Sequence, residues 1–239
     1  MSLDVKPPLH KRAIAFAKAP GLRKRVKQDD VGHALVIRAL LGPGDDAVDV
    51  GAHTGEITTL LRESAPQGRV LAVEPLPHLA AGLRQQFPTG VIVEERALTD
   101  EAPGEITFHH VRDLPGFSGL RPRETPVESE VELLTVQTER LDDLVERHGL
   151  APKLIKIDVE GAELGVLRGA RRTIAAHQPA FLIEHGTAAQ EYGESLVSFY
   201  DLAEELGLRI FDLDGHALLT RAAFLAAADD GYFNWLLRP

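Results

Sequence analysis

The sequence predicts an α/β domain built on a mostly parallel sheet, and three stretches of the chain lead to that prediction. Residues 47–50 (AVDV) form a short apolar run that ends in the turn GAHTG and continues into the helical pattern EITTLLRES. Residues 69–75 (RVLAVEP) and 154–158 (LIKID) are two further apolar runs, and each ends at an acidic residue before a helical segment. Strands that alternate with helices in this way form parallel sheets with helices on both faces.

The glycine turn after the first expected strand is typical of a ligand-binding loop. Gly51 allows a positive φ or the close approach of a ligand. Gly55 precedes a helix whose free N–H groups can face a polar ligand. The spacing G-x-x-x-G differs from the G-x-G-x-x-G pattern of dinucleotide-binding domains. Asp49 stands at the end of a buried strand, where its charge needs a ligand amine or backbone N–H groups as partners.

Acidic residues end three of the expected strands, at Asp49, Glu74 and Asp158. Ligands of open parallel sheets bind at the carboxyl ends of the strands, so we expect these three side chains to converge on one crevice. Glu74 comes 23 residues after Gly51. An acid at the end of the second strand can accept two hydrogen bonds from a ribose diol.

Three residues near this crevice are candidates for catalytic proton transfer. His185 follows the apolar run 179–183 (PAFLI) at the expected rim of the sheet, and an unperturbed histidine pKa of about 6.5 suits a general base. Asp158 and Glu160, which lies in the turn after it, are the other two. We expect His185 to be the base.

The remaining elements fit one domain over residues 29–239. Residues 29–41 predict a helix that packs on the sheet, and residues 91–100 predict a third strand with its exit loop. Residues 105–111 (EITFHHV) predict an extra strand in a hairpin at the edge of the sheet. The last two expected strands, in residues 208–215 and 232–239, are predicted to pair antiparallel at an edge.

The composition is that of an ordinary globular protein. The chain has 239 residues, 44% of them hydrophobic and 26% charged, and its zero cysteines exclude disulfides, a thiol nucleophile and a cysteine zinc site. The sequence has no apolar run of about 18 residues, as a membrane helix would need, and no secretory signal. A cytoplasmic location without a membrane span is therefore expected.

The net charge of -10 is unevenly distributed. Residues 1–28 carry eight Lys or Arg and one acid, so a basic N-terminal arm precedes an acidic body. This arm lacks the interleaved aromatic residues typical of nucleic-acid binding, so we do not expect a nucleic-acid partner. Residues 113–125 (DLPGFSGLRPRET) are rich in Pro and Gly and are the candidate substrate loop. Arg121 and Arg123 in this loop could hold a phosphate or a carboxylate.

These motifs resemble the FkbM family of S-adenosylmethionine-dependent methyltransferases. The matching segments follow one another from Val48 to Gly186: VDVGAHTG, VLAVEP, ERALTD, TERLDDLV, LIKIDVEGAELGVLRGA and FLIEHG. The pattern KIDVEGAELxVLxGA is specific to the family, whereas many methyltransferases share VDVGAxxG. The resemblance implies a Rossmann-like class I methyltransferase fold: a mostly parallel seven-stranded sheet, an antiparallel last strand and helices on both faces.

The resemblance also implies which residues of the first turn bind the cofactor. Asp49, Gly51 and Gly55 would cradle the methionine part of S-adenosylmethionine, and His53 would line it. Thr58 stands where the family often has a serine that can reach the carboxylate of the cofactor. The family usually has asparagine at position 53, so the contacts of His53 are expected to differ.

Matches farther along the chain imply the rest of the cofactor site. Glu74, followed by Pro75, would bind the ribose hydroxyls, and Arg96 and Ala97 would border the adenine. Asp158 would lie beside the methionine end, near the transferable methyl group.

The reaction implied by the resemblance is O-methylation of a hydroxyl on a sugar or a secondary metabolite, with His185, Asp158 or Glu160 as the base. A divalent cation held by Asp158 with Glu160 or Glu184 could instead acidify the hydroxyl, but no ligand spacing demands a metal and none is assigned. Two other functions stay open. One is a nicotinamide-dependent oxidoreductase, against which the missing glycine fingerprint counts. The other is a non-catalytic cofactor-binding module.

Overall fold

The structure, a computed structural model, describes residues 31–229 and 233–239. The basic arm predicted at residues 1–28 lies outside the described residues. Seven strands form the central sheet: β1 (Asp46–Val50), β2 (Val70–Val73), β3 (Val91–Glu94), β7 (Pro152–Ile157), β8 (Ala180–Glu184), β9 (Arg209–Phe211) and β10 (Asn234–Arg238).

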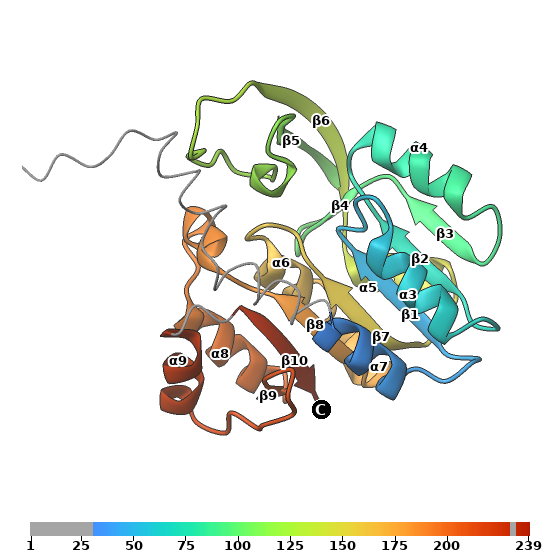
Figure 1. The fold of residues 1–239 in the computed structure, drawn as a ribbon, viewed down its shortest axis with the longest axis vertical. Helices are drawn as coiled ribbons and strands as arrows, with labels where there is room; N and C mark the ends of the chain where they lie inside the picture. The colour runs from blue at the N-terminus through green and yellow to red at the C-terminus, as the bar shows by residue number, and fades with distance from the viewer. Residues whose placement is uncertain (1–30, 230–232) are drawn as a thin grey trace, which may run out of the picture.

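The order of the strands explains where a ligand can bind. It is β3-β2-β1-β7-β8-β10-β9, and β10 alone runs antiparallel to its neighbours β8 and β9 (Figure 1). The antiparallel pairing predicted for the last two strands is confirmed, and β10 is inserted between β8 and β9. Since β2, β1 and β7 are parallel neighbours, their carboxyl ends open at the same edge of the sheet.

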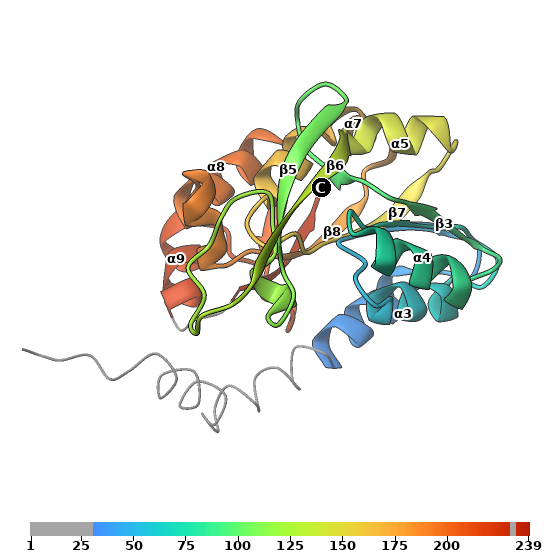
Figure 2. The same cartoon turned by 90° about the horizontal axis from the view of Figure 1, so that it is seen from above.

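Helices cover both faces of the sheet. They are α3 (Glu56–Ser64), α4 (Pro77–Gln86), α5 (Leu141–Arg147), α6 (Glu163–Arg168), α7 (Arg171–His177), α8 (Leu196–Glu205) and α9 (Arg221–Asp229). Residues 31–40 are also helical, and with α3 and α4 they lie on the face opposite α5, α7 and α8 (Figure 2). None of the helices within the described residues is both long and apolar enough to cross a lipid bilayer.

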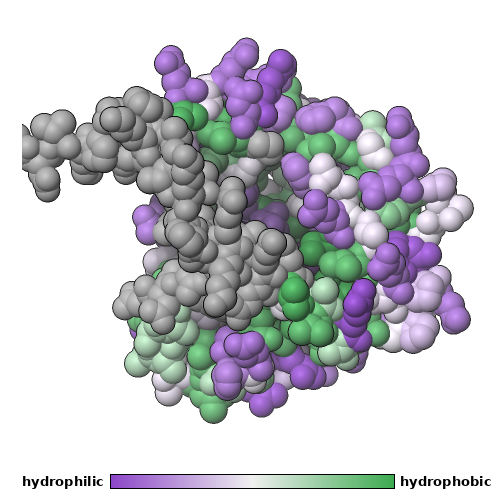
Figure 3. Space-filling view, viewed as in Figure 1, coloured by the Kyte–Doolittle hydropathy of each residue, from purple (hydrophilic) through white to green (hydrophobic). Residues whose placement is uncertain are grey.

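Successive side chains of a buried strand point to opposite faces of the sheet, so each strand contributes to the hydrophobic core on both faces. Val48 and Val50 of β1 pack in the cluster that contains α5 to α9, whereas Ala47 packs in the cluster with Ile37 and Leu61 on the other face. This packing confirms that the predicted helix, which the structure describes over residues 31–40, lies on the sheet; residues 29 and 30 are outside the described residues. In the space-filling view, hydrophilic side chains prevail along the upper and right edges of the face shown, and hydrophobic ones gather near its middle and at its lower left (Figure 3).

A separate three-stranded sheet stands beside the central one. It contains β4 (Ala97–Leu98), β5 (Gly104–Val111) and β6 (Val131–Glu139) in the order β4-β6-β5. The hairpin predicted from residues 105–111 is present, but its expected place at the edge of the main sheet was wrong. Residues 95–96 interrupt the extended backbone between β3 and β4. Because β4 pairs with β6, the hairpin belongs to the separate small sheet.

Candidate functional site

The carboxyl ends of β2, β1 and β7 open into a cavity of about 410 Å³, called here the main cavity. Asp49, Glu74 and Asp158 all line it, so the structure brings together the three acids that end these strands. The small sheet and the loop that follows β5 supply the opposite wall, through Phe108, Gly116, Ser118 and Leu120. The substrate loop predicted at residues 113–125 therefore borders the site.

Asp49 is held in place by Thr58 on α3. Its side chain is only 1% exposed, and Thr58 Oγ1 donates a hydrogen bond of 2.5 Å to its Oδ2 atom. Burial raises the pKa of Asp49 to about 6, against the opposing effect of the Thr58 hydrogen bond. Thr58 is fully buried and does not line the cavity. The hydroxyl at position 58 thus orients Asp49.

Glu74 is fixed by the backbone at the end of β2. Its Oε2 atom accepts a hydrogen bond from His53 N, and its Oε1 atom accepts one from Leu76 N, both at 2.9 Å. Burial raises the pKa of Glu74 to about 7, although the two backbone donors act in the opposite direction. Each carboxyl oxygen retains acceptor capacity, so this side chain can still receive two ligand hydroxyls.

The residues of the glycine turn differ in their roles. Gly51 has a φ of +81°, and a Cβ atom there would lie 1.8 Å from the carbonyl oxygen of Asp158. Gly55 has a φ of +85° and does not line the cavity; a Cβ atom there would lie 2.8 Å from Leu83 Cδ2 on α4. His53 has a φ of +46°, a left-handed conformation that asparagine adopts more readily than most residues.

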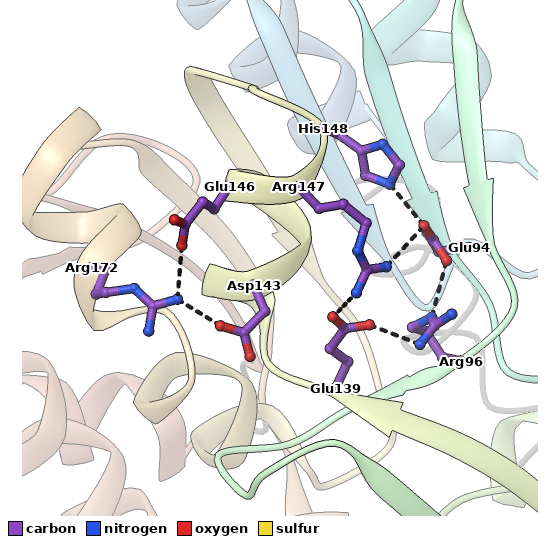
Figure 4. Close-up of polar contacts among 8 residues, drawn as sticks. All are labelled: Glu94, Arg96, Glu139, Asp143, Glu146, Arg147, His148 and Arg172. Carbon is purple, nitrogen blue, oxygen red and sulfur yellow. Dashed lines mark hydrogen bonds and ion pairs between the residues drawn. The ribbon is translucent and has the colours of Figure 1, made fainter.

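Arg96 lines the main cavity, as do Pro75 and Ala97. Its Nε atom donates to Glu94 at 3.0 Å, and its Nη1 atom donates to Glu139 at 2.7 Å (Figure 4). Glu139 is buried at the end of β6 and also pairs with Arg147. These contacts connect β3, β6 and α5, so the guanidinium of Arg96 has a defined position.

Lys156 is a site residue that sequence reasoning missed. Its side chain is 1% exposed, lines the main cavity and places Nζ 3.7 Å from Asp158 Oδ2. In the sheet it lies opposite Asp49. A lysine inside an otherwise apolar strand, LIKI, was the available signal, because a buried ammonium group needs acidic partners. Here those partners are strand-end acids of the cavity.

A smaller cavity of about 170 Å³, called here the side cavity, adjoins the main one and shares Asp158 and Glu160 with it. Glu160 has a φ of +55°, and Arg123 Nη1 donates to its Oε2 atom at 2.8 Å. Burial and the neighbouring Asp158 carboxylate raise the pKa of Glu160 to about 7, while Arg123 acts to lower it. Arg123 also donates to the carbonyl of Gly116 in its own loop at 2.9 Å. Through these two bonds Arg123 connects the loop to the turn at Glu160.

His185 is not brought to either cavity. Its ring is fully buried, stacks on Phe199 with centroids 4.5 Å apart, and places Nδ1 3.0 Å from Glu163 Oε2. Glu163 Oε1 in turn accepts a hydrogen bond of 2.7 Å from Gly161 N. The expectation of a rim histidine assumed that the side chain after β8 points toward the ligand. It points instead into the layer that contains α6 and α8, where it supports the turn at Gly161.

Comparison with known proteins identifies the family. Residues 49–210, more than half of the chain, match the model described as the methyltransferase FkbM domain. This protein belongs to the FkbM methyltransferase family. Its resemblance to that family, drawn from the motifs, is thereby confirmed, and membership makes the protein a methyltransferase.

Two curated methyltransferases are similar to at least half of the chain. The 2-O-methyltransferase NoeI of Sinorhizobium fredii (strain NBRC 101917 / NGR234) is 29% identical over 181 residues, which are 70% of this chain and 72% of NoeI. Methyltransferase sdnD of Sordaria araneosa is 28% identical over 153 residues, which are 51% of this chain and 59% of sdnD.

A solved FkbM structure shares the fold. The crystal structure of methyltransferase FkbM from Methylobacillus flagellatus KT has a TM-score of 0.50 and 20% identity to this chain, and the match covers 83% of this chain and 44% of the other. The present chain thus spans less than half of that protein. The predicted class I methyltransferase fold, with a mostly parallel seven-stranded sheet and an antiparallel last strand, is confirmed.

Membership of the FkbM family implies the use of S-adenosylmethionine. The chemistry of the main cavity fits this molecule, because it offers buried acceptors for hydroxyl and ammonium donors at Glu74 and Asp49. The cavity volume also lies within the range of small-molecule sites.

Proposed function

We propose that this FkbM methyltransferase transfers a methyl group from S-adenosylmethionine to a hydroxyl group of a saccharide or another small hydroxylated molecule. The observation that carries the proposal is the convergence of Asp49, Glu74 and Asp158 on one cavity at the ends of three adjacent strands. The similarity to NoeI, a 2-O-methyltransferase by name, supports an oxygen acceptor.

The residues divide along the cavity by chemistry. Glu74 accepts hydrogen bonds from the ribose diol, while Asp49 and the turn at Gly51 receive the amino-acid end of the cofactor. Arg96, with the neighbouring Ala97 and Pro75, borders the adenine. These assignments extend the hydrogen bonds that already orient Glu74 and Arg96 in the protein alone.

When bound, the cofactor supplies an electrophilic methyl group on a positively charged sulfur. The protein has to hold the acceptor oxygen in line with that group, exclude water and take up the hydroxyl proton. Asp158 lies where the two cavities meet, and its contact with buried Lys156 limits the directions in which its carboxylate can turn. Gly116, Ser118 and Leu120, in the loop after β5, line the main cavity together with Asp158.

Calorimetric titration with S-adenosylhomocysteine tests the cofactor site. We expect micromolar binding by the wild type and a loss of at least about tenfold in Glu74→Ala and Asp49→Ala, because each removes a buried acceptor. Glu95→Ala is the matched control, since the Glu95 side chain is half-buried, does not line the cavity and pairs only with Arg84 among the described residues. Unchanged binding in both cavity variants, or tighter binding of NAD than of S-adenosylhomocysteine, would contradict the assignment.

The acceptor class is tested by radiolabelled methyl transfer to a panel of methyl glycosides and small alcohols, with amines and thiols as controls. We expect label on at least one hydroxylated compound and none on the controls. Transfer to an amine or thiol alone would overturn O-methylation, even where the cofactor binds as expected.

A further inference from the structure

Glu184 lies beside the proposed reaction centre but has no part in the cofactor site. It ends β8, and the register pairs Ile157 of β7 with Ile183 of β8, so Asp158 and Glu184 follow at neighbouring strand ends. Both line the side cavity, which meets the main cavity at Asp158 and Glu160. A molecule in the side cavity would therefore contact Glu184 and face the main cavity at Asp158 and Glu160.

The neighbouring carboxylates are already occupied by protein partners. Glu160 receives a 2.8 Å hydrogen bond from Arg123, and Asp158 lies 3.7 Å from the ammonium of Lys156. Glu163 uses one oxygen for Gly161 N and the other for His185. Within the described part of the chain, the carboxyl group of Glu184 has no hydrogen bond or ion pair of this kind, so it is free to bind a ligand hydroxyl.

The surroundings of Glu184 suit a group that takes up a proton. Burial and the carboxylates of Asp158, Glu160 and Glu163 raise its pKa to about 8, and only Lys156 acts strongly against them. A general base works best when its pKa lies close to the operating pH. Near neutral pH this carboxyl group is poised between its two protonation states.

We propose that Glu184 is the general base that takes the proton from the acceptor hydroxyl, and that the acceptor binds in the side cavity. The inference rests on the methyl transfer proposed above. The acceptor oxygen forms its bond to the methyl carbon while the carbon–sulfur bond breaks, and the electron pair of that bond stays on sulfur. The hydroxyl proton passes to the Glu184 carboxylate and leaves through the side cavity.

A binding experiment tests this placement without turnover. S-adenosylmethionine carries a positive charge that S-adenosylhomocysteine lacks, and a nearby positive charge favours an ionised carboxylate. Calorimetry at pH 7.5 in buffers of different ionisation enthalpy gives the protons released on binding each compound. We expect the wild type to release roughly 0.5 proton more with S-adenosylmethionine. This difference should fall by more than half in Glu184→Gln and mostly persist in Glu160→Gln.

Three controls keep that result interpretable. Glu191→Gln changes an exposed glutamate nearby on η2 (Thr187–Tyr192) and should leave proton release unaltered. Glu184→Asp retains the carboxyl group and should retain part of the difference, and thermal unfolding checks that each variant is folded. A wild type without the difference, or a Glu184→Gln variant that keeps it, would overturn the proposal.

Activity supplies the second arm, with an acceptor from the hydroxyl panel. Glu184→Gln should lower kcat/KM by about 100-fold or more and abolish the rise of kcat/KM with pH, while its affinity for S-adenosylhomocysteine stays within twofold. A variant that keeps wild-type kcat/KM refutes the role of Glu184 as base. Absence of any transfer by the wild type refutes the acceptor class instead, and the proton-release measurement still decides whether Glu184 faces the transferred group.

Discussion

At the scale of single residues, the site consists of acids whose burial is unfavourable and whose hydrogen bonds limit that cost. Glu74 is 4% exposed and keeps two backbone donors, and Asp49 is 1% exposed with one hydroxyl donor. Neither set of donors outweighs burial, since both pKa values remain raised. Acids held ready in this way bind a donor-rich ligand more strongly than exposed acids would.

The raised pKa of Glu74 predicts how stability depends on pH. A carboxyl group with a folded pKa of about 7 and an ordinary value of 4.5 favours the folded state most below pH 4.5 and loses that contribution as pH rises to 7. The loss for Glu74 alone is roughly 3 kcal/mol at most. Urea unfolding at pH 5 and pH 8 should show a smaller fall in the free energy of unfolding for Glu74→Gln than for the wild type. An equal fall would show that Glu74 is not the group responsible.

Gly51 should tolerate no side chain. In Gly51→Ala the new Cβ atom would meet the Asp158 carbonyl at 1.8 Å in a backbone conformation with positive φ. We expect a loss of at least about 2 kcal/mol in unfolding free energy and of cofactor binding. Gly82→Ala is the control, because Gly82 is exposed on α4 with nothing within 4 Å of a Cβ atom. That variant should gain up to about 1 kcal/mol.

At the scale of elements, side chains from one segment form hydrogen bonds that hold the ends of another segment in place. The motif TERLDDLV spans the end of β6 and the start of α5, and its residues anchor their neighbours. Glu139 binds Arg96 at the cavity, while the buried Asp142 accepts hydrogen bonds from Arg172 N and Thr173 N at the start of α7. The structure thus gives this motif a supporting role.

Removal of this cap should destabilise the protein. Asp142→Ala leaves two N–H groups of the first turn of α7 without their acceptor, and we expect a loss of about 2 kcal/mol in urea unfolding. Asp143→Ala is the matched neighbour, since Asp143 pairs with the exposed Arg172 side chain (Figure 4) and should cost no more than about 0.5 kcal/mol. Similar losses in the two variants would show that α7 is not capped by Asp142.

At the scale of the whole molecule, the small sheet and its loop close the site that the main sheet begins. Arg123 in the loop after β5 is bonded to Glu160 in the turn after β7, and this pair joins the two segments. A second contact joins it to the turn after β8, where Leu120 N donates to the Tyr192 hydroxyl at 3.0 Å. The walls of the two cavities thus come from segments that lie far apart in the sequence.

These contacts predict how the loop responds to substitution. Arg123→Gln removes the ion pair with Glu160 and the contact with the ring of Phe117, so residues 113–125 should exchange their amide hydrogens faster, while the exchange of β1 and β7 stays unchanged. Arg121→Gln, in the same loop and exposed, serves as the control. Unaltered exchange after loss of Arg123 would show that other contacts hold the loop.

The sequence by itself determined how strands and helices follow one another along the chain, the glycine turn and the three acids at the strand ends. Those features are local, because apolar periodicity and turn residues depend on neighbours in the chain. They also sufficed for the resemblance to the FkbM family.

Only the tertiary structure decided which side chains face the ligand. Lys156 lies in β7 and His185 directly follows β8, yet the lysine lines the cavity and the histidine points into the helical layer. The separation of the β5–β6 hairpin from the main sheet and the pairing of Arg123 with Glu160 were likewise decided by contacts between distant segments. The direction of a side chain at a strand end depends on what packs against it, and that information is spread over the whole chain.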